Sequence, residues 1–399
     1  MNLEELFENK IRSLDISPSQ FRLAKERYEK VAAHLVADGF DCDIYPQGSI
    51  ALGTVVRPYR DDRDQSFDID MICQLNQEKS QTSPRKVREE IGDSLSTHAA
   101  GMKTPMTIDN RCFTLNYAET ASLEFKLDIV PAVPECDSVI TSIMAQGVDY
   151  EKAKMAIAII EAQPDCHEDK WIPSNPAGYK VWFEGINEPF RVIARERERK
   201  RIFEESREIY ASVQEVPSQL ERSVLQRTIQ ILKRHRDVYY CRAKQAKFKP
   251  ASAVITTLAA QAATQIPAHC SLLQCLQHVV WVIVRSEELL AKAPQELLVT
   301  RQTALLLMRS SSKWELRNPA NPADNLTDSW DSDTAQWFFK WLRAVEHDFL
   351  KLGNLSEIQQ ERQILSALGI SLTQHEQREA HREPAIPRIT QPTKPWRSV

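Results

Sequence analysis

Residues 67–75, FDIDMICQL, decide how the first part of this chain folds. In a β-strand, residues i and i+2 point to the same side. The odd positions of the segment are all apolar, whereas the even positions begin with Asp68 and Asp70. These two carboxylates would lie about 7 Å apart along the strand. The segment therefore predicts a strand that buries one face and presents a pair of acids on the other.

The composition narrows the class of protein. The chain has 399 residues, 42% hydrophobic and 27% charged, which is typical of a soluble protein of two or three domains. Its net charge of −4 does not favour stable nucleic-acid binding, although a local basic groove is compatible with it. The eight cysteines form no CxxC pair, and no apolar run is long enough to span a membrane. We therefore expect a cytoplasmic protein without a membrane partner.

The pattern of periodicity changes along the chain. Helices are expected at 17–39 and 83–99, each opened by a Ser-Pro pair, and strands at 41–46, 111–118 and 123–133. This mixture indicates an α/β or α+β unit. Residues 205–380 are helical in period, and the tail is rich in proline. We place the domain boundaries at 1–175, 176–380 and 381–399, the last being a flexible tail.

The segment 123–133, LEFKLDIVPAV, repeats the design of 67–75. If the two strands are neighbours, Asp128 lies beside Asp68 and Asp70. Three converging carboxylates repel one another unless a cation neutralises them, and oxygen-only ligands suit Mg²⁺ or Mn²⁺. Because Mg²⁺ usually shares its shell with phosphates, the expected substrate is a nucleotide. The alternative is that these acids are ordinary charges at strand ends or edges.

The stretch 47–54, QGSIALGT, follows an expected strand and opens a helix. A Gly-Ser pair at such a junction offers backbone N–H groups and a hydroxyl to a phosphate. A plain turn with an N-cap is the alternative. The chain has no GxxxxGK[ST] motif, so this is not a Walker loop.

The order of these segments resembles a known family. Gly48-Ser49, then Asp68-Ile-Asp70, then Asp128 on a later strand resembles the active-site signature of the DNA polymerase β-like nucleotidyltransferases. The sequences of these segments are similar to those of the bacterial CD-NTase (cGAS/DncV-like) family. LKRHRDVYY, KPASAVITTLAA and NPANPADNLTDSW resemble the helical domain shared with oligoadenylate synthetases. The resemblance spans about residues 45–335 and implies a bilobal α+β fold, with a polymerase β-like core followed by a helical C-terminal domain.

The family resemblance also implies roles for particular residues. The catalytic residues, which would bind two Mg²⁺ or Mn²⁺ ions, are Asp68, Asp70 and Asp128. The residues that would contact the nucleotide phosphates are Gln47, Gly48 and Ser49. Lys233 in LKRHRD matches the triphosphate-binding lysine, and Ser252 in KPASA matches its polar partner.

The activity that the resemblance implies is the synthesis of a cyclic di- or trinucleotide second messenger in anti-phage signalling. Nucleoside triphosphates, ATP among them, would be the substrates. An effector protein would respond to the product, and a regulator could bind the C-terminal tail. A template-independent enzyme that makes linear oligonucleotides or extends RNA is the alternative. A nucleotide-binding regulator that keeps only the fold is a third reading, against which the three intact acids argue.

Two further motifs have ordinary explanations. The basic run 191–201, RVIARERERKR, is typical of a solvated helix face more than of a nucleic-acid patch. HCSLLQCLQH, residues 269–278, has a helical period and an apolar face. We expect its cysteines to be buried in a core helix, with a zinc site as the less favoured interpretation.

Overall fold

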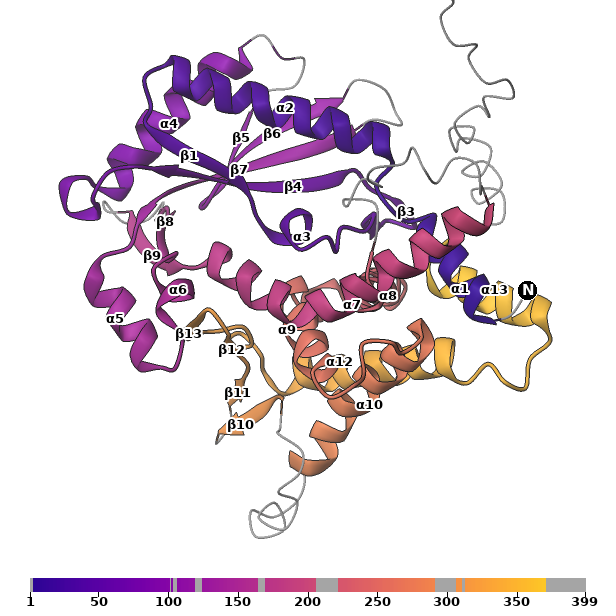
Figure 1. Ribbon diagram of the computed structural model, residues 1–399. Helices are drawn as coiled ribbons and strands as arrows, with labels where there is room; N and C mark the ends of the chain where they lie inside the picture. The colour runs from indigo at the N-terminus through magenta and orange to yellow at the C-terminus, as the bar shows by residue number, and fades with distance from the viewer. Residues whose placement is uncertain are drawn as a thin grey trace, which may run out of the picture.

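The computed structural model of the chain describes residues 3–100, 102, 106–118, 124–163, 169–205, 222–290, 306–310 and 313–370. These residues form a lobe built around a β-sheet and a lobe built mainly of helices (Figure 1). The expected tail at 381–399 lies outside the described residues. The α+β class expected from the sequence is confirmed.

A mixed sheet of seven strands forms the first lobe, in the order β1-β4-β7-β6-β5, with β8 on β7 and β9 on β8. β4 and β7 are parallel, and the other pairs in this sheet are antiparallel. The strands are β1 (Cys42–Pro46), β4 (Phe67–Leu75), β5 (Thr107–Ile108), β6 (Phe113–Ala118), β7 (Glu124–Pro134), β8 (Ile157–Glu161) and β9 (Lys170–Ser174). A separate hairpin joins β2 (Tyr59–Arg60) to β3 (Arg63–Asp64).

Two helices cover one face of this sheet, α2 (Pro18–Ala37) and α4 (Pro84–Ala99) (Figure 1). Both begin as predicted: the Ser17 hydroxyl accepts from the Gln20 amide in a capping box, and the Ser83 hydroxyl accepts from the Lys86 amide. The short elements of this lobe are α3 (Gly48–Ala51), η1 (Lys79–Gln81), α5 (Asp137–Ala145) and α6 (Tyr150–Ala153).

The apolar side of β4 packs under α2 and α4, in one core with the matching side of β7. The opposite side of β4 carries charged side chains only at its beginning. Ile72 is 1% exposed and packs in a small second core with Val130 and Ile157, because β8 joins the sheet at that end. The acids therefore occupy only the part of this face nearest the start of the strand.

The second lobe is entered through the long helix α7 (Pro176–Glu205). Its other helices are α8 (Val224–Arg242), η2 (Ala246–Phe248), α9 (Ser252–Ala263), α10 (Leu272–Leu290), α12 (Ser332–Val345), η3 (Glu346–Leu350) and α13 (Glu357–Ala367). The core of this lobe is rich in aromatic side chains, including the fully buried Phe338 and Trp341.

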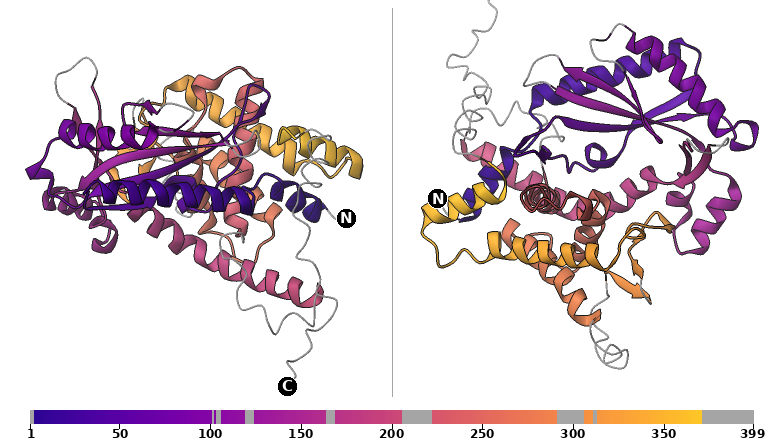
Figure 2. Two further views of the ribbon diagram at one scale, coloured as in Figure 1. Left: turned by 90° about the horizontal axis from the view of Figure 1, so that it is seen from above. Right: turned by 180° about the vertical axis from the view of Figure 1, so that it is seen from behind.

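The amino-terminal helix α1 (Leu3–Arg12) packs on the helical lobe. The rings of Phe7 and Phe349 meet edge to face with centroids 5.1 Å apart, and Lys10 Nζ lies 2.8 Å from Glu361 Oε1. Both views in Figure 2 place the amino end of the chain beside α13. The division at 175/176 stays a prediction. Apolar residues of α1, together with Leu14, Leu52 and Val56, belong to the core of the helical lobe.

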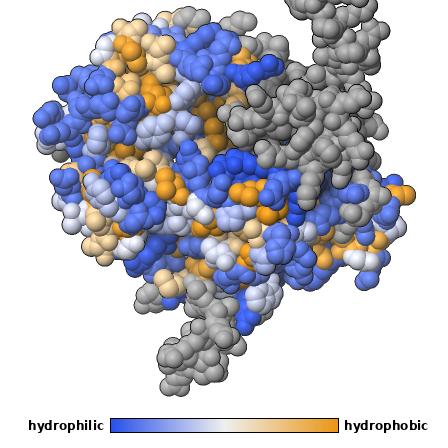
Figure 3. Space-filling model, in the orientation of Figure 1, coloured by the Kyte–Doolittle hydropathy of each residue, from blue (hydrophilic) through white to orange (hydrophobic). Residues whose placement is uncertain are grey.

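The helical lobe also contains short strands, which the sequence did not predict. β10 (Met308–Ser310) pairs with β11 (Lys313–Glu315), and β12 (Arg317–Asn318) pairs with β13 (Asn321–Asn325). The last pair contains asparagine and proline, and the Asn325 side chain supports it through hydrogen bonds with the main chain of Trp314, Leu316 and Thr327. On the face shown in Figure 3, apolar and polar residues are interspersed.

Candidate active site

The parallel pairing of β4 with β7 brings the predicted acids together. In the register, Asp70 lies opposite Asp128 and Asp68 lies opposite Lys126. All these positions are on the side of the sheet away from α2 and α4, because the apolar positions of both strands fill the core beneath those helices. Asp68 is exposed, and Asp70 and Asp128 are half-buried. The expectation that the two strands are neighbours is confirmed.

Crowding makes two of these carboxyl groups hard to ionise. Partial burial, Asp128 and Asp68 raise the pKa of Asp70 to about 6, against the opposing charge of Lys233. The pKa of Asp68 is also raised, first by desolvation and then by Asp128. Lys126, Arg60 and Lys249 oppose that shift. The surrounding lysine and arginine side chains therefore do not fully offset the repulsion within the cluster, as expected of a cation site.

The chemistry of the donors suits a hard divalent ion, since all three predicted ligands are carboxylates. Within the described ranges, no three His, Cys, Asp or Glu side chains converge closely enough to cage an ion unaided. Mg²⁺ commonly binds one or two carboxylates and completes its shell with substrate phosphates and water. The residues fit ions that arrive with a nucleotide, and they do not form a closed protein cage.

The Gly48 turn lies directly against Asp70. The backbone N–H of Gln47 donates to the backbone carbonyl of Asp70 over 2.9 Å, and this bond joins the turn to β4. Gly48 has a φ of +59°, and a Cβ atom there would lie 2.9 Å from Asp70 Oδ2. Gln47 is the N-cap of α3 and makes no side-chain capping bond. Glycine suits this position, because both the positive φ and the nearby Asp70 carboxylate disfavour a side chain.

Lys233 reaches the same place from α8. It is 7% exposed, and its Nζ donates to the Thr54 carbonyl over 3.0 Å. Burial first, and then Arg236, lower the pKa of Lys233 to about 7, whereas Asp237 and Asp70 act in the opposite direction. The structure thus brings Lys233 near Asp70, at the segment that follows the Gly48 turn.

Lys233 is one of several α8 side chains that hold this segment. Gln226 Nε2 donates to the Leu52 carbonyl over 2.9 Å, and Gln230 Nε2 donates to the Val55 carbonyl over 2.5 Å. The spacing 226, 230, 233 places these donors on one face of the helix. The polar stripe in LQRTIQILKR was the sequence signal for this contact, but its target could not be inferred from the pattern alone.

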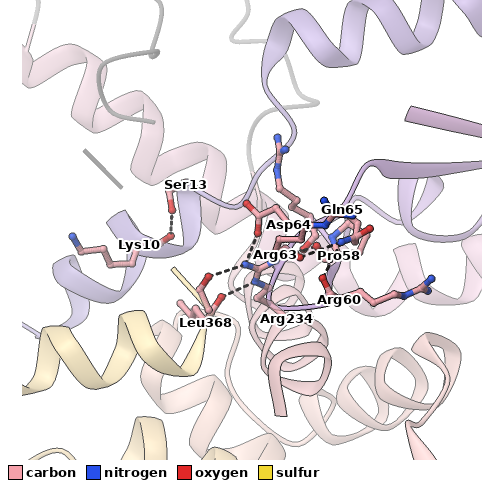
Figure 4. Close-up of polar contacts among 11 residues, drawn as sticks. Lys10, Ser13, Pro58, Arg60, Arg63, Asp64, Gln65, Arg234 and Leu368 are labelled. Atoms are coloured by element: carbon pink, nitrogen blue, oxygen red, sulfur yellow. Dashed lines mark hydrogen bonds and ion pairs between the residues drawn. The ribbon is translucent and has the colours of Figure 1, made fainter. Parts of the chain in front are cut away.

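Arg234 extends the same contact to the β2–β3 hairpin (Figure 4). Its side chain is fully buried, and its guanidinium donates to the Arg57 carbonyl over 2.9 Å and to Asp64 Oδ1 over 2.7 Å. It also donates to the Leu368 carbonyl over 2.7 Å, at the end of α13. Arg234 therefore joins three segments that are far apart in the sequence.

Ser252 is the first residue of α9 and is bonded by a residue that the sequence analysis missed. Arg236 Nη1 donates to Ser252 Oγ over 3.1 Å and to the Pro250 carbonyl over 3.0 Å. Asp237 pairs with Arg236 at 2.7 Å and with Lys249 at 3.5 Å. Because Arg236 uses an acceptor site of the Ser252 hydroxyl, that hydroxyl keeps its proton for another partner.

The cysteines of segment 269–278 are buried in the core of the helical lobe, as expected from the sequence. Cys270 and Cys275 are buried, with exposures of 6% and 0%, and both belong to the core of the helical lobe. In the basic run, Arg191 pairs with Glu188, and Arg197 donates to the His269 carbonyl. Neither segment approaches the acids of β4 and β7 through any of these bonds.

Comparison with known proteins agrees with this arrangement. Residues 1–146 match the family model of the Second Messenger Oligonucleotide or Dinucleotide Synthetase domain. A c-di-GMP synthase from Roseivirga ehrenbergii is 22% identical over 366 residues, which are 90% of this chain and 82% of that protein.

Solved structures show the same fold at low identity. The CD-NTase CdnG of Bradyrhizobium diazoefficiens, in complex with GTP, has a TM-score of 0.63 and 19% identity, with 92% of this chain and 98% of that chain covered. The cyclic AMP-GMP synthase DncV of Vibrio cholerae has a TM-score of 0.53 and 14% identity, with 94% and 82% covered. The bilobal fold expected from the sequence is thereby confirmed.

Proposed function

We propose that this chain, which belongs to the CD-NTases and carries their Second Messenger Oligonucleotide or Dinucleotide Synthetase domain, joins nucleoside triphosphates into a cyclic dinucleotide. The observation that carries the proposal is the pairing of Asp70 with Asp128 across β4 and β7, with the Gly48 turn against Asp70. Acids that repel one another therefore lie beside a turn that could accept a phosphate, and this supports the proposal. A structural charge cluster would not need that turn.

Each predicted residue has a task in this proposal. Asp68, Asp70 and Asp128 would hold two Mg²⁺ or Mn²⁺ ions. Bound ions would neutralise the triphosphate and lower the pKa of the attacking ribose hydroxyl. The residues that would contact the phosphates are Gln47, Gly48, Ser49, Lys233 and Ser252. Their work is mainly positioning and charge neutralisation.

The bond changes are those of a nucleotidyl transfer. The ribose hydroxyl oxygen of one nucleotide forms a bond to the α-phosphorus of another, and the bond from that phosphorus to pyrophosphate breaks. The hydroxyl proton is released to solvent. A second transfer between the ends of the linear intermediate releases a second pyrophosphate and closes the ring.

A short cyclic product is preferred to a linear one for two reasons. The net charge of −4 offers no overall attraction for a long polyanion, and the curated relative is named a c-di-GMP synthase. That name adds GTP to ATP among the substrates to test. Linear oligonucleotides remain the alternative that the product assay must exclude.

The cellular role follows from the family resemblance. We infer that the product is a second messenger in anti-phage signalling in the cytoplasm, read by an effector protein. A solved complex of the related E. coli MS115-1 CdnC with a HORMA protein supports a search for a regulator. Within the described ranges, no helix is both long and apolar enough to cross a lipid bilayer.

The test is incubation of the full chain with all four NTPs and Mg²⁺ or Mn²⁺, with products identified by mass spectrometry. We expect a cyclic dinucleotide whose mass is unchanged by phosphatase, because a cyclic product has no phosphomonoester. Asp128→Asn serves as the inactive control. A ladder of linear products that lose phosphate would support the alternative, and no pyrophosphate release under any condition would refute both.

A further inference from the structure

Thr114 on β6 makes a direct contact with one of the proposed ligands. It lies opposite Asp128 in the antiparallel register of β6 and β7, and its Oγ1 donates to Asp128 Oδ1 over 2.6 Å. Thr114 is only 6% exposed. Since the strand order is β4-β7-β6, Asp128 lies between Asp70 on one neighbouring strand and Thr114 on the other.

The direction of this hydrogen bond follows from the groups involved. The Thr114 hydroxyl is the donor and the Asp128 carboxylate is the acceptor, so the hydroxyl proton points at Asp128. The Cys112 thiol lies 4.0 Å from Thr114 Oγ1. At that distance the thiol is a weak partner compared with Asp128, whose bond to Thr114 is 2.6 Å long. The Thr114 hydroxyl is thus committed to Asp128.

A metal-binding aspartate needs such a partner. The terminal torsion of an aspartate side chain is broad, so packing alone does not fix the plane of the carboxylate. A short hydrogen bond to Oδ1 fixes that plane and leaves Oδ2 as the oxygen without this bond. Outer hydrogen bonds of this kind orient metal ligands and are worth about 10–100-fold in affinity.

We propose that Thr114 is a positioning residue for the reaction, whose hydroxyl fixes the Asp128 carboxylate so that it can share a divalent ion with Asp70. This inference rests on the proposed function. A purely structural Thr114 would contribute to folding through its methyl group and its strand position, and its hydroxyl would not affect the ion.

Two substitutions separate these roles, because Thr114→Val keeps the shape and removes the hydroxyl, whereas Thr114→Ser keeps the hydroxyl. Mn²⁺ binding to the full chain is measured by electron paramagnetic resonance, with the nucleotide-free protein and with a non-hydrolysable ATP analogue. We expect Thr114→Val to weaken Mn²⁺ binding by roughly tenfold or more, and Thr114→Ser to stay within about twofold of wild type. Turnover should fall with Mn²⁺ affinity in the same variants.

Thr228→Val is the matched control. Thr228 is also buried, but its hydroxyl donates to the Val224 carbonyl within α8 over 2.9 Å. This variant should lose some thermal stability and keep its Mn²⁺ affinity. Should Thr114→Val not fold, Thr114→Ala provides a second hydroxyl-free variant.

The outcomes are distinguishable. Normal Mn²⁺ binding by Thr114→Val, or an equal loss in Thr114→Ser, overturns the role of the hydroxyl while wild-type synthesis leaves the proposed function intact. A wild-type chain that neither binds Mn²⁺ nor releases pyrophosphate overturns the proposed function, and the role of Thr114 with it.

Discussion

The strand β4 contributes acids to the candidate site and the helix α8 contributes the cation Lys233, but the two elements differ in how their polar side chains are satisfied. β4 buries one side and presents Asp68 and Asp70 on the other, where these acids have too few cations around them. α8 is buried on almost every side, and its polar groups donate to carbonyls of residues 52–58. The acids need something from outside the chain, whereas the helix already has protein partners.

This difference predicts different consequences of substitution. Removing an acid from β4 relieves repulsion among the carboxylates and takes away a proposed metal ligand. Turnover should therefore fall more than the stability of the fold. Removing a donor from α8 leaves a buried carbonyl unpaired, which costs about 1–3 kcal/mol of stability. Substitution of Lys233 should affect both stability and activity, because its amine donates to the Thr54 carbonyl and its charge opposes that of Asp70.

The largest expected effect is at the acids themselves. Asp70→Ala and Asp68→Asn should each lower turnover by at least about a thousandfold, because positioning and charge neutralisation are lost together. Pyrophosphate release and circular dichroism are measured side by side. Asp93→Asn, an exposed position on α4 on the other side of the sheet, is the control and should be fully active. Near-normal turnover of either site variant would remove the acids from the chemistry.

The next effect is at the turn that supports them. Gly48→Ala would place a Cβ atom 2.9 Å from Asp70 Oδ2, so we expect turnover to fall roughly a hundredfold through misplacement of Asp70. Gly39 also has a positive φ, of +91°, but a Cβ atom there meets nothing within 4 Å. Gly39→Ala therefore carries the backbone strain without the clash. Equal activity of the two variants would show that contact between residue 48 and Asp70 does not limit turnover.

The sequence predicted β4 and β7 because alternation is a local property. The residues 67–75 carry their own evidence of a buried and an exposed side, and Asp128 follows the same rule on β7. Thr114 could not be chosen in this way, since its role depends on the register between β6 and β7. Nor could Arg236, whose partners Pro250 and Ser252 lie beyond the end of its helix.

The same limit explains why the contacts of α1 and the short strands of the helical lobe could not be read from the sequence. α1 has an ordinary amphipathic pattern, and nothing in it indicates that Phe7 meets Phe349. The strands at 317–325 contain asparagine and proline, which propensity assigns to loops, and side-chain bonds from Asn325 compensate for the short backbone pairing. The position of α1 and the strands at 317–325 depend on tertiary contacts and not on local sequence preference.

A smaller effect is expected at Lys233. Lys233→Ala should weaken binding of a non-hydrolysable ATP analogue by at least about tenfold, because it removes an amine that a bound polyanion would hold in its charged form. Ser252→Ala should weaken it only a few-fold, since one neutral hydrogen bond is lost. Isothermal titration measures both, with Lys86→Ala on the exposed side of α4 as the control. Equal affinities of wild type and Lys233→Ala would exclude Lys233 from the nucleotide site.

The smallest effect tests whether the acids of β4 oppose folding when no ion is bound. The pKa of Asp70 is raised to about 6, so its stabilising neutral form is complete below about pH 4 and is lost as pH rises through 6. In EDTA at pH 8, Asp70→Asn should therefore melt a few degrees above wild type, because it removes a carboxylate that is costly to ionise.

At pH 4 the difference in Tm between Asp70→Asn and wild type should be much smaller, because Asp70 is then almost fully neutral in the folded chain and about half neutral in the unfolded chain. Adding Mn²⁺ at pH 8 should raise the Tm of wild type more than that of the variant, since only wild type keeps the full set of carboxylates. Asp93→Asn controls for the loss of one charge and should show neither trend. A stabilisation by Asp70→Asn that is equal at both pH values would place its origin in packing. In that case the repulsion among the three acids would not oppose folding, and the contrast between β4 and α8 would be lost.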